Sequence, residues 1–211
     1  SISIDTSGMN SIIVVPGAAL GLNQSMIDNN ISLINNASIM LTGFEVPLEI
    51  ASYCLMRAKS KNITTILNPA PYFNIDHDTY KLVDYLTPNE HEASSLTKIR
   101  VKSIDDARVA GRKICELGVG TSIITMGEKG VLCTRNANDV EGIYIPSFKL
   151  KEKVIDTVGA GDVFNGTFAT AISEKMELED ALNFANKAAS LSVTRKGAAL
   201  SAPLRNEINQ L

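Results

Sequence analysis

Residues 155–171 read I-D-T-V-G-A-G-D-V-F-N-G-T-F-A-T-A and form the clearest pattern in the chain. Gly159, Ala160 and Gly161 carry little or no side chain, and the apolar residues that follow them recur at helical spacing. The pattern therefore predicts a bare loop that runs into a buried helix. The first N–H groups of a helix have no partner within it and lie at the positive end of its dipole. Such a helix start predicts a site for a phosphate.

Asp162 comes directly after these small residues. Its carboxylate would repel a bound phosphate, which is tolerable if its task is to face a neutral alcohol and accept the proton during phosphoryl transfer. We therefore expect a kinase that acts on a hydroxyl, with Asp162 as base and the amides of Gly159–Asp162 as an anion hole. A purely structural interpretation stays open, because a lone G-x-G is a weak signal. In that interpretation the glycines only let the helix pack closely, and Asp162 only caps it.

Composition limits the class of protein. The chain has 211 residues, of which 45% are hydrophobic and 20% charged, so it can bury a core as one domain, or at most two. Its net charge of -3 and the absence of a basic run argue against nucleic acid or an anionic membrane as partner. Three cysteines without C-x-x-C spacing favour reduced core thiols and a cytoplasmic protein. No apolar run reaches the length of a membrane span, and no leader opens the chain.

Strands and helices are expected to alternate over most of the chain, after an opening hairpin of 2–5 and 11–15. Further strands are expected at 39–41, 63–67, 83–86, 121–125, 131–134 and 142–145. Helices are expected at 26–35, 46–58, 103–117 and 178–193, after T-P-N-E-H-E-A at 87–93, after the glycines at 159–161, and from 204. This alternation predicts a parallel sheet with crossover helices, whose sites lie at the carboxyl ends of the strands. His77 and His91 are expected at the surface.

The string D-T-V-G-A-G-D-V-F-N-G closely resembles the C-terminal signature of the ribokinase/PfkB carbohydrate kinase family. Three further motifs, N-x-x-E, T-x-G-x-x-G and V-T-R-K-G-A, occur in the family's order. The resemblance implies a ribokinase-like three-layer α/β/α sandwich with a mostly parallel central sheet, formed by 1–211 as a single domain. It also implies that the N-terminal strands and most of the lid are lacking, with 1–16 as a remnant of lid or edge strands.

The resemblance assigns roles near the sugar and the phosphates. Glu45 follows the strand at 39–41 and matches the position that contacts the sugar, although a solvated carboxylate at a helix start explains it equally well. Asn89 and Glu92 match the N-x-x-E motif, in which the Asn reaches the phosphates and the Glu organises Mg2+ through water; ordinary capping is the alternative. Asp162 is both the base and a substrate contact, and Gly159, Ala160 and Gly161 complete the catalytic set.

The segment T-M-G-E-K-G resembles the nucleotide loop of the family, although two glycines between strands often make only a hairpin turn. Lys129 would add positive charge to such a loop; an ordinary solvated lysine is the alternative. The nucleotide-binding residues implied by the resemblance are Asn89, Glu92, Thr125, Met126, Gly127, Glu128, Lys129, Gly130, Gly161, Asp162 and Asn186, the last of them near the adenine.

The run V-T-R-K-G-A-A-L-S-A-P at 193–203 resembles the loop that surrounds a monovalent cation, usually potassium, in ribokinases. The implied ligands are the side chain of Asp156, the carbonyls of Val158, Ser192, Arg195 and Gly197, and Ser201. An oxygen-only ring with one carboxylate suits a large, weakly hydrated cation. A helix end closed by Gly197 is the structural alternative, but it does not explain the pairing of this loop with D-T-V.

The function implied is the ATP-dependent phosphorylation of a sugar hydroxyl, most closely that of D-ribose to D-ribose 5-phosphate, with Mg2+ and K+ as cofactors. The partners expected are ATP or ADP and a small sugar, with a homodimer as the candidate assembly. Because the segment that grips the sugar is not found, we expect weak or absent turnover from these 211 residues alone, with nucleotide binding retained.

The alternatives to this function are another sugar or nucleoside kinase of the family, or a nucleotide-binding or interaction module without turnover. A Rossmann dehydrogenase is disfavoured, because no glycine fingerprint follows the first strand.

Overall fold

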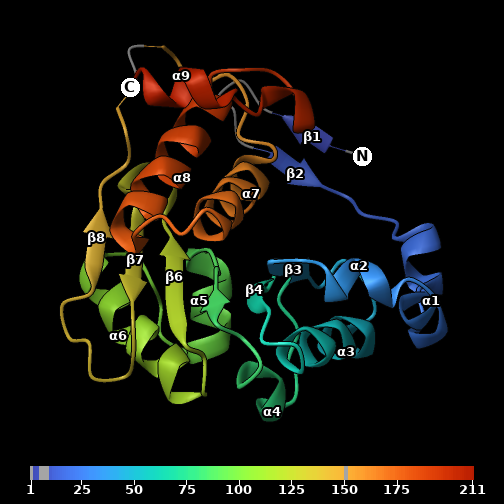
Figure 1. Ribbon diagram of the computed structural model, residues 1–211. Coiled ribbons are helices and arrows are strands. Elements are labelled where there is room, and N and C mark those ends of the chain that lie inside the picture. Colours follow the sequence, from blue (N-terminus) through green and yellow to red (C-terminus); the bar gives the residue numbers. More distant parts are fainter. Residues whose placement is uncertain (1, 5–9, 150–151) are drawn as a thin grey trace. The chain divides into compact units, whose positions relative to one another are not determined.

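The computed structural model describes residues 2–4, 10–149 and 152–211 (Figure 1). The chain divides into two compact units. The sheet unit comprises Pro16–Met126 and Leu132–Tyr144, and the α7 unit, named after its helix α7 (Ala160–Ser173), comprises Ser1–Val15, Gly127–Val131 and Ile145–Leu211. The assignment of 1–211 to a single domain stays a prediction.

A sheet of six strands organises the sheet unit. Its order is β3 (Ile39–Gly43), β4 (Thr64–Asn68), β5 (Tyr85–Leu86), β6 (Thr121–Thr125), β7 (Val131–Thr134) and β8 (Ile143–Ile145). The pairs β3–β4, β4–β5 and β5–β6 are parallel, which confirms the sheet type expected from the alternation of strands and helices. Parallel strands are buried on both faces, and Ile66, Leu67, Ile123 and Ile124 are accordingly 0% exposed.

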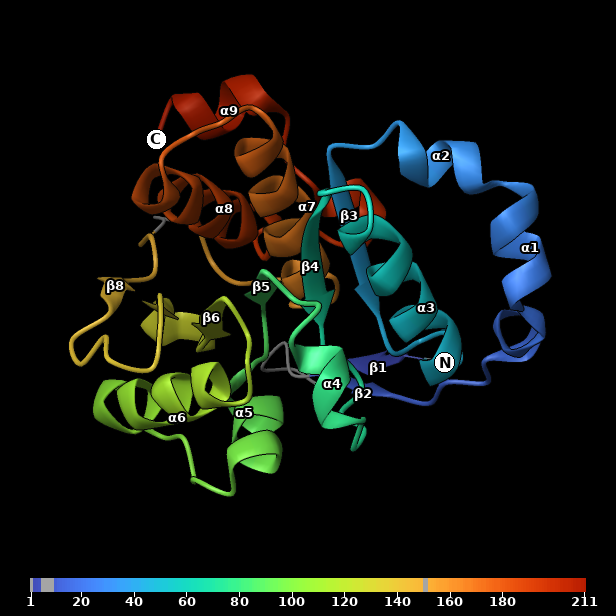
Figure 2. The same ribbon diagram turned by 60° about the horizontal axis from the view of Figure 1, so that its bottom comes forward.

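Helices of the sheet unit pack against the strands through one apolar cluster. They are α3 (Leu48–Lys59), the short α4 (His77–Tyr80), which the sequence analysis missed, α5 (Glu90–Thr97) and α6 (Ile104–Glu116). Both Figures 1 and 2 show α5 beside α6. The fully buried members of the cluster include Leu55, Leu67, Leu86, Ala93, Ile114 and Ile124. Burying such side chains supplies the main favourable term for folding, about 25 cal/mol per Å2 of apolar surface.

The helix expected at 26–35 is wrong as a single element. The structure contains α1 (Gln24–Asn29) and α2 (Ile31–Asn35), preceded by the 3-10 helix η1 (Gly17–Gly21). Asn23 caps α1, because its Oδ1 accepts the N–H of Met26 at 3.1 Å. Asn30 breaks the helix with φ -117° and ψ 18°, and its Nδ2 donates to the Met26 carbonyl at 2.9 Å. An asparagine side chain that bonds to nearby backbone competes with helical hydrogen bonds.

The α7 unit contains a hairpin and three helices. The strands β1 (Ile2–Ile4) and β2 (Asn10–Ile12) are antiparallel, which confirms the hairpin, while its turn at 5–9 lies outside the described residues. The helices α7, α8 (Leu178–Ser192) and α9 (Arg205–Asn209) follow later in the chain, with the 3-10 helices η2 (Gly127–Lys129) and η3 (Ala199–Ser201). α7 and α8 lie side by side, with Phe168 and Leu182 0% exposed. The interpretation of 1–16 as a lid remnant stays a prediction.

The three cysteines, Cys54, Cys115 and Cys133, are buried free thiols, as expected of core residues. Burial raises the pKa of Cys133 to about 12, so this thiol is neutral at physiological pH. Over the described ranges, no helix is both long enough and apolar enough to cross a bilayer.

Gly111 allows α6 to lie against β7, and its replacement tests this contact. A Cβ at Gly111 would collide with Oγ1 of Thr134 and lie 3.0 Å from its Cβ. We expect Gly111→Ala to lower the free energy of unfolding by about 1–3 kcal/mol despite the higher helix propensity of alanine. Urea unfolding measures the change. The matched control is Gly166→Ala in α7, where a Cβ would meet nothing within 4 Å and where we expect no loss; equal losses in both variants would contradict the contact.

Candidate functional site

The start of α7 leaves main-chain donors open. Gly159 lies in the left-handed region, with φ +77° and ψ 1°, a conformation that favours glycine. Its carbonyl accepts the N–H of Val163 at 2.9 Å, the first i to i-4 bond of the helix. Among the described residues, no acceptor is found for the N–H groups of Gly161 and Asp162. These donors at the positive end of a helix of 14 residues can bind an anion from outside the chain.

The side chain of Asp162 is exposed in the first turn of α7, and no residue in the described part of the chain pairs with its carboxylate. Gly161 beside it is exposed as well, and a Cβ there would meet nothing within 4 Å. The packing of the chain therefore does not require glycine at 161, although glycine costs about 0.5–1 kcal/mol relative to alanine in a helix. The open space lies beside the unpaired N–H groups, where a phosphate would approach.

Asp156 ties the loop before α7 to the loop after α8. Its side chain is buried, Oδ1 accepts the N–H of Val158 at 2.9 Å, and Oδ2 accepts the N–H of Gly197 at 3.0 Å. These hydrogen bonds, that from Gly197 first, hold the pKa of Asp156 below its ordinary value. The carboxylate is therefore charged in the folded protein, and its contribution to stability is present at neutral pH and is lost only as the pH falls through the lowered pKa.

The residues around Asp156 fit a monovalent cation. No described donor occupies the carbonyls of Val158, Arg195 or Gly197, and the carboxylate of Asp156 keeps further lone pairs after its two hydrogen bonds. The hydroxyl of Ser201 donates to the Ala198 carbonyl at 2.6 Å, so its own oxygen can still act as a ligand. This set contains only oxygens and a single carboxylate, as a large, weakly hydrated cation prefers.

In the sheet unit, the carboxyl ends of the parallel strands bring several predicted residues to one edge. Glu45 is exposed just after β3, and the neighbouring Phe44 N–H donates to the carbonyl of Ala70 after β4 at 3.0 Å. Asn89, after β5, forms a parallel bridge with Thr125 at the end of β6. Residues from four consecutive strand ends therefore line the edge where parallel sheets place their ligands.

Asn89 and Glu92 form a complete capping box at the start of α5. Asn89 Oδ1 accepts the Glu92 N–H at 2.9 Å, and the carboxylate of Glu92 accepts the N–H and Nδ2 of Asn89 at 2.8 and 2.9 Å. Glu92 is only 6% exposed, and burial raises its pKa although these bonds oppose the shift. A Mg2+ ion held through water needs one such oriented carboxylate, so Glu92 fits the role.

A second capping box shows that burial is not needed for capping. Asp106 holds the same position in α6, where its Oδ2 accepts the Ser103 N–H and hydroxyl at 2.9 and 2.8 Å. These bonds, with the hydroxyl as the largest cause, lower the pKa of Asp106, which is only partly buried. The burial of Glu92 is therefore a cost that its capping role does not explain.

The glycines of the predicted nucleotide loop have different structural roles. Gly130 has φ +97°, and a Cβ there would collide with the carbonyl of Ile145, so the backbone itself requires glycine. Gly127 has φ +51° and is surrounded by open space. Met126 is 1% exposed and belongs to the apolar cluster of the sheet unit, which leaves only its main chain for a ligand. Glu128 and Lys129 between the glycines are exposed.

Asn186 is largely buried on α8, and its Nδ2 donates to the Pro146 carbonyl at 2.7 Å. The side chain thus holds the segment after β8 in place, a structural contact that the motif comparison did not anticipate. Its position near an adenine stays a prediction.

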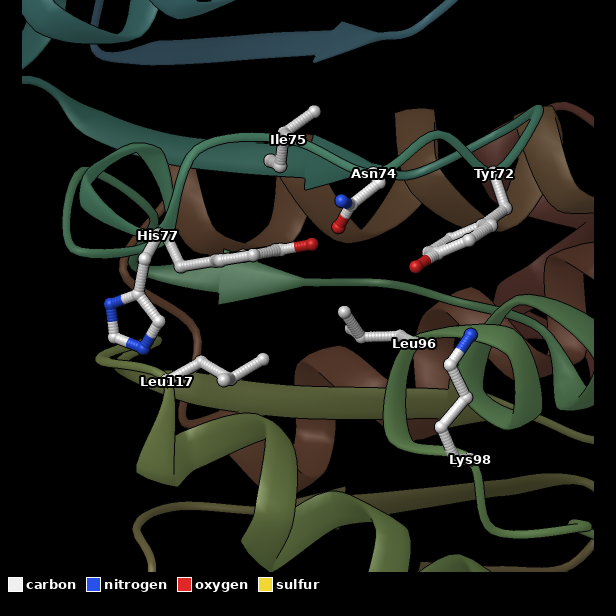
Figure 3. A pocket seen from close by; sticks show the side chains of 8 residues that line it. Tyr72, Asn74, Ile75, His77, Leu96, Lys98 and Leu117 are labelled. Carbon is white, nitrogen blue, oxygen red and sulfur yellow. The ribbon is translucent and has the colours of Figure 1, made fainter.

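The sequence analysis also missed a cavity of about 480 Å3 in the sheet unit. It is lined by Tyr72, Asn74, Ile75, His77, Tyr80, Leu96, Lys98 and Leu117. Figure 3 shows the Tyr72 hydroxyl and the Lys98 amine pointing into it, and Lys98 Nζ lies 5.9 Å from the Tyr72 ring centroid. Burial raises the pKa of Tyr80 to about 12. None of the predicted site residues lines this cavity, and its residues share no sequence spacing that could have revealed it.

Comparison with known proteins places the chain among sugar kinases. The sequence model of a family described as pfkB family carbohydrate kinase matches residues 1–205 of this chain. A ribokinase of Staphylococcus aureus (strain COL) is 33% identical over 212 residues, which cover 100% of this chain and 68% of the relative. The crystal structure of a Thermotoga maritima ribokinase is 40% identical with a TM-score of 0.84, over 99% of this chain and 67% of that one. An Arabidopsis thaliana ribokinase complexed with ribose and ATP is 31% identical with a TM-score of 0.89, again over 99% and 67%.

These similarities confirm the ribokinase-like fold expected from the motifs. The chain spans about two thirds of the length of the curated relatives that it matches. The roles of the individual site residues are not tested by the similarities and stay predictions.

Removing the charge from each of the two capping boxes is predicted to change the pH dependence of stability in opposite directions. Glu92→Gln keeps a side chain that suits this cap position but removes a buried charge. Because burial raises the pKa of Glu92, ionisation costs folding free energy as the pH rises through the ordinary range of a carboxyl group. An amide has only one acceptor oxygen, so one of the two hydrogen bonds from Asn89 is lost at every pH. We expect the stability of Glu92→Gln relative to the parent to increase as the pH rises from about 4 to 7. Urea unfolding at several pH values measures the change.

Asp106→Asn is the matched control for this series. The pKa of Asp106 is lowered, so its charge stabilises the fold at neutral pH and this contribution is lost as the pH falls through the lowered value. We expect Asp106→Asn to be less stable than the parent at pH 7 and to approach it in acid. If the stabilities of both variants relative to the parent changed in the same direction with pH, the contrast between the boxes would be contradicted.

Proposed function

Because the chain belongs to the pfkB family of carbohydrate kinases, we propose that the protein transfers a phosphoryl group from ATP to a hydroxyl of D-ribose, giving D-ribose 5-phosphate. Family membership confirms the predicted enzyme class, a sugar kinase. Ribose as the acceptor is supported by relatives named ribokinase and by the Arabidopsis thaliana structure, whose title names ribose and ATP. The observation that carries the proposal is the start of α7, where unpaired N–H groups flank an exposed carboxylate.

In the proposed reaction, the terminal hydroxyl of the sugar lies against Asp162. Its oxygen forms a bond to the γ-phosphorus, the bond from that phosphorus to the bridging oxygen breaks, and ADP leaves with that electron pair. The hydroxyl proton passes to the carboxylate of Asp162 as the new bond forms. The N–H groups of Gly161 and Asp162 stabilise the negative charge that grows on the transferred group. Preorganised hydrogen-bond donors have the same effect in other enzymes that transfer acyl or phosphoryl groups.

Other residues of the chain serve the nucleotide and the cations. The loop 125–130 would receive the triphosphate, with its glycines allowing close approach, and Glu92 would hold Mg2+ through water. Mg2+ bound with ATP neutralises charge on the phosphates. The ring around Asp156 would hold K+, which would supply positive charge near the transferred phosphoryl group. A cytoplasmic homodimer completes the proposal.

Replacing the base tests the proposal directly. In a chain that also includes the segment that grips the sugar, we expect Asp162→Asn to bind ATP with nearly the parent affinity, because the main-chain donors remain, and to lower phosphoryl transfer by about 10^2-fold to 10^4-fold. Calorimetry measures ATP binding, and ribose-dependent release of ADP in the presence of Mg2+ and K+ measures transfer. Deoxyribose, fructose and a nucleoside, offered in place of ribose, test the acceptor.

An equal loss of ATP binding and transfer in Asp162→Asn would identify a structural carboxylate and contradict its role as base. ATP binding by the parent without ADP release in the presence of any of these acceptors would favour a binding module instead. Faster release with another acceptor than with ribose would overturn the choice of sugar but not the enzyme class.

Gly161 and Gly166 provide a matched pair on α7, since a Cβ at either would meet nothing within 4 Å. We expect both Gly161→Ala and Gly166→Ala to raise the free energy of unfolding by about 0.5–1 kcal/mol, through helix propensity. Only Gly161→Ala should weaken ATP-dependent transfer, because its methyl group would occupy the space beside the open N–H groups. Thermal unfolding and ADP release measure the two effects. Equal activities of the two variants would exclude close phosphate approach at Gly161.

A further inference from the structure

Several contacts fix the short helix α9 to the rest of the α7 unit. Ile208 is 4% exposed, and the Arg205 guanidinium donates to the Glu174 carboxylate at 2.6 Å. The same guanidinium lies 5.2 Å from the ring centroid of Phe184 on α8. A helix of 5 residues does not persist alone in water, so these contacts hold it in place. α9 thus provides a fixed support for the side chains that it carries.

Glu207 on α9 holds Arg195 with both carboxylate oxygens. Arg195 Nη2 donates to Oε1 at 2.6 Å and Nη1 to Oε2 at 3.3 Å. Oε2 also accepts the N–H of Leu204 at 2.6 Å, at the start of the same helix. A two-point contact between a planar guanidinium and a carboxylate restricts orientation as well as distance. Glu207 is therefore oriented by its own helix and in turn orients Arg195.

Arg195 belongs to the loop whose carbonyls form the proposed cation ring. Its N–H donates to the Ser192 carbonyl at 3.0 Å, and two positions later the N–H of Gly197 donates to Asp156. The next residue, Ala198, lies against the start of α7, because a Cβ at Gly159 would lie 3.2 Å from its Cα and its Cβ. A shift of this loop would therefore move both the cation ligands and the first turn of α7.

We propose that Glu207 is a positioning residue for the cation site, which holds the Arg195 carbonyl in the ring through the side chain of the same residue. This inference rests on the proposed function, because it concerns the cation of that reaction. Glu207 touches neither substrate nor cation in this arrangement. It acts through Arg195, and its loss leaves every cation ligand in the chain.

A structural role and a positioning role make different predictions. The side chains of Arg195 and Glu207 are 33% and 35% exposed, and ion pairs of this kind contribute little to overall stability. A purely structural role predicts a small loss of stability that is the same at all potassium concentrations. A positioning role predicts a change in the potassium concentration at which the protein responds.

The experiment compares Glu207→Gln with Glu174→Gln. The two glutamates make the two ion pairs of α9, each at 2.6 Å, but only Glu207 reaches the cation loop. Thermal unfolding is followed as KCl replaces choline chloride at constant ionic strength, without ATP or sugar. We expect potassium to raise the unfolding midpoint of the parent. Glu207→Gln should need about threefold or more potassium for half of this effect, and Glu174→Gln should match the parent.

Arg195→Gln provides a second line of evidence, because it removes the guanidinium but keeps the carbonyl ligand. We expect it to shift the potassium response as Glu207→Gln does, and the double variant to shift it no further, since both changes break one contact. An unchanged potassium response in Glu207→Gln would overturn the inference, as would equal shifts in Glu174→Gln. A parent without any potassium-specific stabilisation would also overturn it, whereas the kinase assignment is judged separately by ADP release.

Discussion

The carboxylate of Asp156 joins two loops that lie 41 residues apart in the chain. A buried carboxylate must be matched by donors, and here the N–H groups of Val158 and Gly197 supply them. Because both donors belong to the main chain, the carboxylate sets the path of the backbone on either side. One loop leads into α7 and the other leaves α8, so the first turn of α7 and the proposed cation ligands share one support. Charge, backbone geometry and the open donors of Gly161 and Asp162 therefore depend on a single side chain.

The glycines near the proposed site are subject to different structural constraints. At Gly130 the backbone of Ile145 leaves no room for a Cβ, and at Gly159 the left-handed conformation disfavours one. Gly161 has neither constraint, and its open space adjoins unpaired N–H groups. Glycine is thus required by chain packing at Gly130, whereas nothing in the packing requires it at Gly161. Only the surroundings of each glycine separate these two cases.

In the sheet unit, too, two copies of one local motif differ because their surroundings differ. The capping boxes of Glu92 and Asp106 satisfy helix donors in the same way. Burial raises the pKa of Glu92, whereas at the less buried Asp106 the hydrogen bonds outweigh desolvation and lower the pKa. The parallel strands bring Asn89 beside Thr125 although 36 positions separate them in numbering. A carboxylate that is costly to bury is thereby placed at the edge where parallel sheets bind ligands.

Local patterns in the amino-acid sequence were sufficient for the strands Thr121–Thr125 and Val131–Thr134 and for the helix that begins after Gly159. Turn residues and apolar periodicity act over a few neighbours, which is why these elements could be predicted. The motifs further indicated the family and the fold. The break at Asn30 escaped prediction, since an asparagine bonds to nearby backbone only when the local geometry allows it. The burial of Glu92, the bond from Asn186 to a carbonyl 40 residues away and the contact of Glu207 with Arg195 were decided by tertiary structure alone. Such contacts join segments that approach one another only after the chain has packed, and spacing along the chain carries no record of them.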